Sequence, residues 1–499
     1  MQTSKSVHIA IDLGASSGRI ICGIYMGNNL KLDEVHRFKN TPITSDGLIC
    51  WDIKSIYNNI IFGINKATNI YRDNIFSIGI DSWAVDFVLL DKNDNYLFYP
   101  RHYRNERNTK AMEYVTKLLG RDYIYNQTGI QFMPINTLYQ LYAEKSSPRS
   151  QIHKAKTLLF IPDLINFWLT GIKTAELTNA STSQLYDPTR KQWSSEILNK
   201  LEIPISLLPK ISPPGTILGS LKRGVSTNLN LTKTKVALTA THDTASAVAA
   251  IQNSKEINSV FISSGTWSLV GIQSDKPIIN NESLKFGFTN EIGFNGNIRF
   301  LKNVTGMWLI QECIEGWKSQ GFNYSIENLV DSAQNANKLQ SFLDPDHDTF
   351  QTHGHMPEKL FRYLNRTNQE LPNTHAELIR IIFKSIAFKY KHTIDNLSHI
   401  LGDPIEKIRV VGGGANNYLL NQMCANITGL EVRAGPIEAT ATGNILGQLI
   451  ATATLPSLEV GHEMIEKSFQ SKIYYPMEVD NSEYDYSQFI KILSKPIWD

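Results

Sequence analysis

Cysteine is scarce in this chain, with four residues among 499. Cys22, Cys50, Cys313 and Cys424 lie far apart in the sequence, and no two of them have the CxxC spacing. Disulfide-rich domains and structural zinc sites usually need closely spaced cysteines, so the sequence argues against both classes. The scarcity is typical of a protein from a reducing compartment, and we expect a cytoplasmic location.

Long apolar runs and an excess of one charge are also missing. The most apolar stretch, TLLFIPDLINFWLTG, contains a Pro and an Asp, and no run reaches the roughly 20 residues that a membrane helix needs. The first residues, MQTSKSVHIAIDLG, lack the apolar core of a secretory signal. Lys and Arg total 49 against 47 acidic residues, a net charge of +2, which disfavours nucleic acid and anionic membranes as partners. We therefore expect a monomer that binds small molecules.

Small-residue turns follow apolar segments at three places in the chain. These are IDLGASSGR at 11–19, SSGTWS at 263–268 and VVGGGANN at 410–417. None matches the GxxxxGK[ST] or GxGxxG pattern, so neither a Walker loop nor a Rossmann dinucleotide site is indicated. Glycine lets a phosphate or a flat ligand approach the backbone closely, although each turn taken alone is equally an ordinary tight connection. Three of them in one chain favour nucleotide binding.

The first turn carries the groups that a phosphate site needs. Successive backbone N–H groups can cradle a phosphate in such a turn, and Ser16, Ser17 and Arg19 add donors. Asp12 ends the preceding apolar segment, where a carboxylate can hold hydrated Mg²⁺ together with phosphate oxygens. The alternative is a hairpin in which Asp12 only stabilises the turn.

An acid–base candidate lies in THDTASA at 241–247, between a predicted strand and a predicted helix of small residues. Asp243 at this place can be a general base, because a base needs a carboxylate held rigidly beside the substrate hydroxyl. His242 and Thr244 would supply neighbouring hydrogen bonds. The alternative is a helix cap, which is the commoner role for a single Asp at a helix start.

Polar and aromatic residues gather in DSWAVDF at 81–87, HYRNER at 102–107 and LKNVTGMW at 301–308. Sugars are bound by aromatic faces together with Asn, Asp, Arg and His side chains. Trp83 and Trp308 can equally be core residues, and this is the commoner role of a single Trp in such segments.

The chain is too long for one hydrophobic core, and its pattern predicts two α/β domains. Strand, small-residue turn, strand occurs at 7–25 and again at 260–273, with a seam expected near 245–255. Further predicted elements are two strands within 75–91, helices within 110–147 and 152–170, strand and helix at 235–251, strand and helix at 408–429, and a helix in 434–453. The polar stretch 177–187 is expected to line a surface or a cleft.

Six segments, taken together and in order, resemble the FGGY carbohydrate kinases. They are IDLGASSGR, GIDSWAVDFVLLD, GIQFMPINTLYQL, THDTASAV, SSGTWSLVG and VVGGGANNYLLNQMCANITG. The resemblance runs from about residue 7 to about residue 450 and is most specific for the branch that phosphorylates L-rhamnulose at its 1-hydroxyl. It implies two ribonuclease H-like, actin-like domains with a central cleft, here placed at 1–248 and 249–499, and the use of ATP and Mg²⁺.

The resemblance also implies roles for individual residues. Asp243 matches the catalytic base, and Asp12 is the candidate for the metal. The ATP contacts match Ala15, Ser16, Ser17, Gly18, Arg19, Thr266, Gln311 and Gly413. The sugar contacts match Ala84, His242, Asp243, Thr244 and Asn303.

Two departures from the family pattern leave the exact sugar open. Ala84 stands in DSWA where DTWG is expected, and Asn105 stands in YRN where YRD is expected. A kinase for another ketose or polyol, such as L-fuculose or xylulose, is therefore an alternative. An actin-like ATPase without a sugar substrate is a second alternative, which Asp243 and Asn303 disfavour.

Overall fold

The computed structural model describes residues 5–252, 258–477 and 482–494. The chain forms two compact units that are discontinuous in sequence. Unit 1 comprises residues 1–253, 273–300 and 439–469, and unit 2 comprises residues 254–272, 301–438 and 470–499. Residues 273–300 and 439–469 therefore pack with the first half of the chain, an arrangement that a single boundary between residues 248 and 249 does not describe. The domain boundary at 248/249 and the central cleft stay predictions.

The sheet of unit 1 has six strands. In spatial order they are β13 (Thr216–Ser220), β14 (Lys235–Leu238), β6 (Ile75–Ser82), β1 (Ser6–Leu13), β2 (Ser17–Tyr25) and β3 (Leu30–Lys39). β1 pairs antiparallel with β2 and parallel with β6, and β6 pairs parallel with β14. The predicted hairpin at 7–25 is thereby confirmed.

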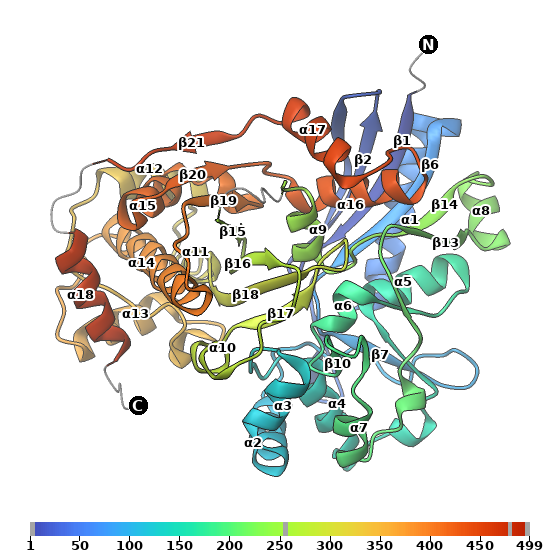
Figure 1. Cartoon of the computed structure of the whole chain (residues 1–499), viewed down its shortest axis with the longest axis horizontal. Coiled ribbons are helices and arrows are strands. Elements are labelled where there is room, and N and C mark those ends of the chain that lie inside the picture. Colours follow the sequence, from blue (N-terminus) through green and yellow to red (C-terminus); the bar gives the residue numbers. More distant parts are fainter. Residues whose placement is uncertain (1–4, 253–257, 478–481, 495–499) are drawn as a thin grey trace. The chain divides into compact units, whose positions relative to one another are not determined.

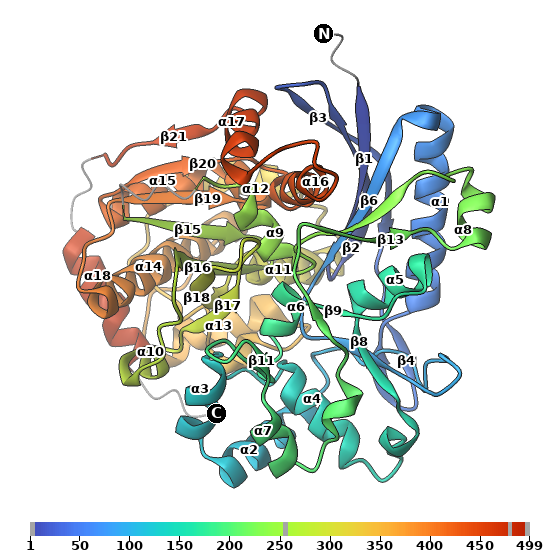
Figure 2. The same cartoon turned by 45° about the vertical axis from the view of Figure 1, so that its right-hand side comes forward.

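Helices cover both faces of this sheet, which explains why every residue of β1 is buried. In Figure 2, α1 (Ile53–Tyr71) and α16 (Ala439–Ala451) lie on opposite sides of β1 and β6. α9 (Asp243–Ala249) packs against α16 on the same side of the sheet. A helix from the late segment 439–469 thus supports the short helix that begins at Asp243.

The second sheet repeats the topology of the first. Its order is β17 (Thr289–Ile292), β18 (Ile298–Thr305), β16 (Trp267–Ser274), β15 (Ser259–Ser264), β19 (Lys407–Val411), β20 (Glu431–Ala434) and β21 (Lys472–Tyr474). β15 pairs antiparallel with β16 and parallel with β19, as β1 does with β2 and β6. The two-fold repeat predicted from the strand, turn, strand pattern is therefore confirmed at the level of topology.

The remaining elements surround these two sheets (Figure 1). In unit 1 they include β4 (Ile43–Ser45), β5 (Leu48–Cys50), β7 (Phe87–Leu90), α2 (Arg107–Leu119), α3 (Arg121–Thr128), α4 (Thr137–Lys145), β8 (Thr157–Phe160), α5 (Ile161–Thr170), β9 (Ala175–Glu176), α6 (Leu177–Ser181), β10 (Tyr186–Asp187), β11 (Gln192–Trp193), α7 (Ser195–Lys200), β12 (Ile211–Ser212), α8 (Arg223–Leu229), α10 (Asn281–Phe286) and α17 (Leu458–Ser468). In unit 2 they include α11 (Trp308–Lys318), α12 (Ile326–Asn335), α13 (Met356–Arg366), α14 (His375–Leu401), α15 (Tyr418–Thr428) and α18 (Ser482–Leu493). No helix in the described part of the chain is long and apolar enough to cross a membrane.

Most predicted elements are confirmed, but the helix expected within 152–170 is wrong in its first part. Residues Thr157–Phe160 form β8, which pairs antiparallel with β7. A four-residue apolar run fits a strand or a buried helix equally well, and here the partner strand decides. The helical stretch 110–147 is likewise broken into α2, α3 and α4, and α3 ends at Gly129 with φ +65°.

The polar stretch 177–187 does not line a surface: every residue from 178 to 187 is buried. The reason is a carboxylate directly before it. Glu176 is fully buried, and its side chain accepts from the backbone N of Thr178 at 2.8 Å and of Asn179 at 3.2 Å, which caps α6. It also accepts from the backbone N and the hydroxyl of Thr241 at 3.0 and 2.8 Å. Polar residues are tolerated in this interior because they have partners.

Replacing Glu176 by Gln is expected to lower the free energy of unfolding by about 1–3 kcal/mol. The Gln amide keeps one acceptor oxygen. Its NH₂ group would face some of the N–H and O–H donors that the Glu176 carboxylate accepts from in the wild type. Urea unfolding measures the change. Glu202→Gln is the matched control, since that side chain is 85% exposed, and an effect of equal size in both variants would contradict this role of Glu176.

Candidate active site

The residues predicted for the site divide between the two units. Unit 1 contains Asp12, Ala15, Ser16, Ser17, Gly18, Arg19, Ala84, His242, Asp243 and Thr244. Unit 2 contains Thr266, Asn303, Gln311 and Gly413.

The first small-residue turn connects β1 and β2. The backbone N of Gly14 donates to the carbonyl of Ser17 at 2.8 Å, and the Asn40 amide donates to the carbonyl of Gly14 at 3.1 Å. Asp12 and Arg19 face each other across the hairpin and form an ion pair. The Arg19 guanidinium thus lies at the turn, held by the Asp12 carboxylate.

The ring of Phe38 leaves no room for a side chain at position 18 unless that ring moves. A Cβ there would lie 2.2 Å from the ring of Phe38, far inside any real contact distance. The sequence singled out Gly18 for its backbone freedom, whereas the structure gives a packing reason for it.

A second acid lies beside Asp12. Asp81 is the residue before the last in β6 and is the register partner of Asp12 on the neighbouring parallel strand. Asp81 is fully buried and accepts from the Asn444 amide of α16 at 2.5 Å. Burial, followed by the nearby Asp12 carboxylate, raises the pKa of Asp81 well above its usual value.

Sequence reasoning placed Asp81 in a polar and aromatic cluster without giving it a role. The available signal was its position at the carboxyl end of a buried strand, as for Asp12. Among the residues that the structure describes, no group of three or more His, Cys, Asp or Glu side chains is arranged to hold a metal ion by itself.

Asp243 is the first residue of α9, and the preceding His242 is the cap residue. Its carboxylate accepts from the backbone N of Thr244 at 2.6 Å, and its side chain is 34% exposed. Loss of solvent around the carboxyl, followed by the negative charge of Asp12, raises the pKa of Asp243 to about 7. A carboxyl with this pKa can accept a proton near neutral pH.

The position of α9 is fixed by strand contacts. Ser82, at the end of β6, donates its backbone N to the carbonyl of Thr241 at 2.8 Å and forms a bridge with His242. This connection places His242 and Asp243 beside the end of β6.

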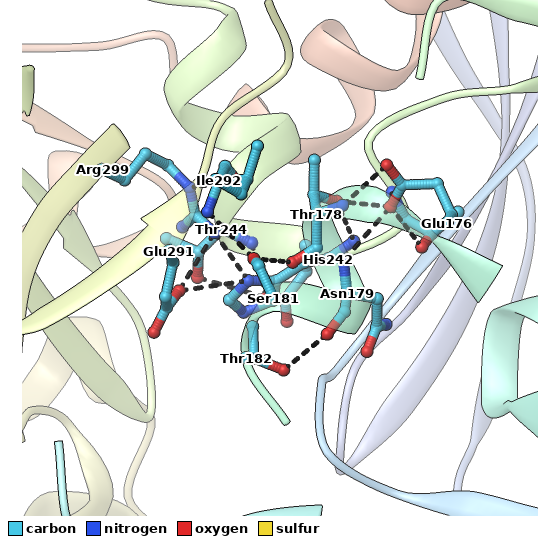
Figure 3. A network of polar contacts seen from close by, with 12 residues as sticks. Glu176, Thr178, Asn179, Ser181, Thr182, His242, Thr244, Glu291, Ile292 and Arg299 are labelled. Atoms are coloured by element: carbon cyan, nitrogen blue, oxygen red, sulfur yellow. Dashed lines mark hydrogen bonds and ion pairs between the residues drawn. The ribbon is translucent and has the colours of Figure 1, made fainter. Parts of the chain in front are cut away.

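His242 lies in a buried polar network, shown in Figure 3. Nδ1 of His242 is 3.0 Å from Nη2 of Arg299. Nη2 of Arg299 also donates to the Glu291 carboxylate at 3.0 Å. Arg299, at the start of β18, is fully buried, and sequence reasoning missed it. Nothing local marks residue 299, because its partner lies 57 positions earlier in the chain.

The segment around Ala84 is held in an unusual backbone conformation. Val85 has φ +69°, which a β-branched residue rarely adopts, and its carbonyl accepts from the Thr137 hydroxyl at 2.7 Å. Asp86 accepts from the indole N–H groups of Trp51 and Trp83 at 2.5 and 3.1 Å. Trp83 is 6% exposed and Trp308 is 7% exposed, so the core interpretation of both is confirmed.

Asn105, the second departure from the family pattern, has a structural use. Its amide oxygen accepts from the backbone N of Ile49 at 3.0 Å, and its NH₂ donates to the carbonyls of Ile49 and His102 at 2.8 and 2.7 Å. A carboxylate cannot donate to these carbonyls, so the amide suits this position.

In unit 2, two of the predicted residues contact each other. The Thr266 hydroxyl donates to the Gln311 side chain at 3.1 Å. In the third small-residue turn, Gly412 has φ +80° and a Cβ on Gly414 would lie 2.0 Å from the Ser264 hydroxyl oxygen. A Cβ on Gly413 would meet open space, so the backbone is accessible at this one glycine.

Comparison with protein families decides the assignment. The N-terminal domain model of the FGGY family of carbohydrate kinases matches residues 7–250, and its C-terminal domain model matches residues 260–452. The chain belongs to the FGGY family of carbohydrate kinases. This FGGY kinase is 40% identical to a rhamnulokinase from Oceanobacillus iheyensis, over 94% of this chain and 98% of that protein. It is 37% identical to a rhamnulokinase from Bacillus subtilis, over 95% and 96% of the two chains.

Solved structures agree with the fold of this FGGY kinase. A ligand-bound xylulose kinase from Lactobacillus acidophilus superposes with a TM-score of 0.78 at 18% identity, over 98% and 96% of the two chains. A Plasmodium falciparum glycerol kinase with ADP gives a TM-score of 0.77 at 16% identity, over 98% of both chains. The predicted two-domain, actin-like α/β fold is confirmed.

Proposed function

We propose that this kinase transfers the γ-phosphoryl group of ATP to the 1-hydroxyl of L-rhamnulose. The observation that carries the proposal is the similarity to curated rhamnulokinases, which reaches 36–40% identity over 93–98% of this chain. The segment GIDSWAVDFVLLD, apart from its departure at Ala84, and the segment THDTASAV support the same substrate.

Asp243 is the proposed general base. Its carboxylate takes the proton from the 1-hydroxyl while that oxygen attacks the γ-phosphorus, and the bond from phosphorus to the leaving ADP oxygen breaks. The raised pKa of about 7 supports this role, because it makes the carboxylate a stronger base than an ordinary Asp. Ala84, His242, Thr244 and Asn303 are the proposed sugar contacts.

The proposed phosphate and nucleotide contacts are Ala15, Ser16, Ser17, Gly18, Arg19, Thr266, Gln311 and Gly413. Asp12 is the proposed Mg²⁺ residue, with Asp81 beside it. Mg²⁺ binds one or two carboxylates and takes its other ligands from phosphate and water, so adjacent carboxylates suit it without a cluster of three. When bound, Mg²⁺ would neutralise charge on the transferring phosphoryl group.

A coupled ADP-release assay over a panel of ketoses and polyols tests the substrate. L-rhamnulose is expected to give the highest kcat/KM. A clearly higher value for L-fuculose, a xylulose or glycerol would overturn this substrate but leave the kinase assignment intact. ATP turnover that does not depend on any added sugar would favour an actin-like ATPase instead.

The pH dependence of the reaction tests the base. Because the unprotonated carboxylate is the active form, kcat/KM for the sugar is expected to rise about tenfold per pH unit below a midpoint near 7. Above that midpoint it should level off. Melting temperatures taken at each pH separate this effect from unfolding, and a flat profile between about pH 5 and 8 would contradict a base with this pKa.

A further inference from the structure

His242, the residue before the proposed base, has a contact that decides which of its ring nitrogens carries the proton. His242 Nδ1 lies 3.0 Å from Nη2 of Arg299, as Figure 3 shows. The Arg299 side chain is fully buried and the His242 side chain is 8% exposed. This contact is therefore shielded from solvent and cannot exchange freely with water.

The chemistry of Arg determines where the imidazole proton lies. A guanidinium has only donors and remains protonated in proteins, so Nδ1 of His242 must accept. Glu291 Oε2 is also near Nδ1, at 3.5 Å, but it is farther away and already accepts from Nη2 of Arg299 at 3.0 Å. A proton on Nδ1 would point at an N–H group, so the ring proton belongs on Nε2.

The Nε2 edge of the ring faces the proposed base. Nε2 is 3.4 Å from Oδ1 of Asp243, longer than the roughly 2.9 Å of a good N–H···O bond. We propose that Arg299 is a positioning residue that holds His242 as the neutral Nε2–H tautomer, so that His242 donates to a sugar oxygen beside the hydroxyl that Asp243 deprotonates. This inference rests on the proposed function of Asp243.

The neutral form of His242 also preserves the base. A second proton on the ring would place a cation against the guanidinium, and burial together with Arg299 lowers the pKa of His242 well below its usual value. An imidazolium next to Asp243 would form an ion pair, favour the ionised carboxylate and weaken it as a base. Glu291 balances the charge of Arg299 at 3.0 Å, so the neutral imidazole adds no charge beside Asp243.

The test variant must keep the buried charges balanced. Arg299→Met alone leaves Glu291 as an unpaired buried carboxylate, which is strongly destabilising. The double variant Arg299→Met/Glu291→Gln removes both charges and the contact to His242. Glu291→Gln alone is the comparison variant, because its amide oxygen still accepts from Arg299 and the Arg299–His242 contact remains. It leaves the buried Arg299 without a counter-charge, so its melting temperature is measured to confirm that it folds.

Nitrogen-15 NMR of histidine-labelled protein without substrate reads the tautomer directly. Signals of His242 are those missing from His242→Gln. Wild type and Glu291→Gln are expected to show the Nε2–H tautomer, and the double variant a mixture that includes Nδ1–H. An Nδ1–H or doubly protonated ring in the wild type would overturn the proposal, as would an unchanged tautomer in the double variant.

Kinetics test whether Arg299 acts through His242. The double variant is expected to lose roughly tenfold in kcat/KM for L-rhamnulose, the size of one lost hydrogen bond, with KM for ATP unchanged. Adding His242→Gln should cost little more, because residues that act through one contact are not additive. Fully additive losses would overturn the proposal. If the wild-type enzyme does not phosphorylate L-rhamnulose, the proposed function is refuted. The NMR result would still decide the tautomer of His242.

Discussion

Asp243→Asn is expected to lower kcat by roughly 10²–10⁴-fold, the usual contribution of a general base. Asn has nearly the same size and can still accept from the backbone N of Thr244, which now donates to Asp243 at 2.6 Å. It cannot take a proton at neutral pH. Calorimetric affinity for the ketose and for ATP should therefore change little while turnover collapses.

The melting temperature separates this role from a helix-capping role. The pKa of Asp243 is raised to about 7 in the folded protein, so ionising this carboxyl lowers the free energy of unfolding; the loss grows as the pH rises towards 7 and is complete above it. Asn removes this cost, and Asp243→Asn should melt at or slightly above the wild-type temperature at pH values above 7. Stability that falls with the loss of activity would favour a structural role instead.

Asp122→Asn is the matched control for this experiment. Asp122 lies in the first turn of α3 and is exposed, so it carries the same chemical change at a similar place in a helix. Its kcat should equal that of wild type. A variant Asp243→Asn that binds sugar, melts normally and turns over at the wild-type rate would rule out Asp243 as the base.

Gly443→Ala is expected to destabilise the protein by about 1–3 kcal/mol or more, the range for overpacking a tight contact. Gly443 lies in α16, and a Cβ there would be 1.8 Å from the backbone carbonyl oxygen of Ser246 in α9. Backbone cannot rotate away as a side chain can, so the two helices must separate. Because α9 begins at Asp243, kcat should fall together with the free energy of unfolding measured in urea.

Gly224→Ala is the control for the same substitution. Gly224 lies in α8, and a Cβ there would meet nothing within 4 Å. Ala is favoured over Gly in a helix by up to about 1 kcal/mol, so this variant should be as stable as wild type or more so. Equal destabilisation by both substitutions would show that the contact between α16 and α9 is not as close as described.

Much of the local structure could be predicted because it depends on near neighbours in the chain. Alternating and continuous apolar runs predicted β1, β2, β15 and β16, and the small-residue turns between them predicted two similar sheets. The segment at 157–160 was mispredicted as helix for the same reason, because four apolar residues carry no period and only their pairing with β7 makes them a strand.

The candidate residues of the site were also visible in the sequence, although their roles stay proposals. Asp12, Gly18 and Asp243 were found because acids and glycines at strand ends and helix starts are conspicuous. Asp81 had the same local signal, and only its register position beside Asp12 gives it weight.

The order of amino acids is enough to define most strands, turns and helices and the residue types at their ends, because hydrophobic periodicity and backbone preference act over a few residues. Which distant residues share a buried volume depends instead on the folding of the whole chain. It set Arg299 against His242, Asn444 against Asp81, and Thr241 against Glu176. Buried donors and acceptors must find partners wherever the chain brings them together, and that pairing depends on how the whole chain packs.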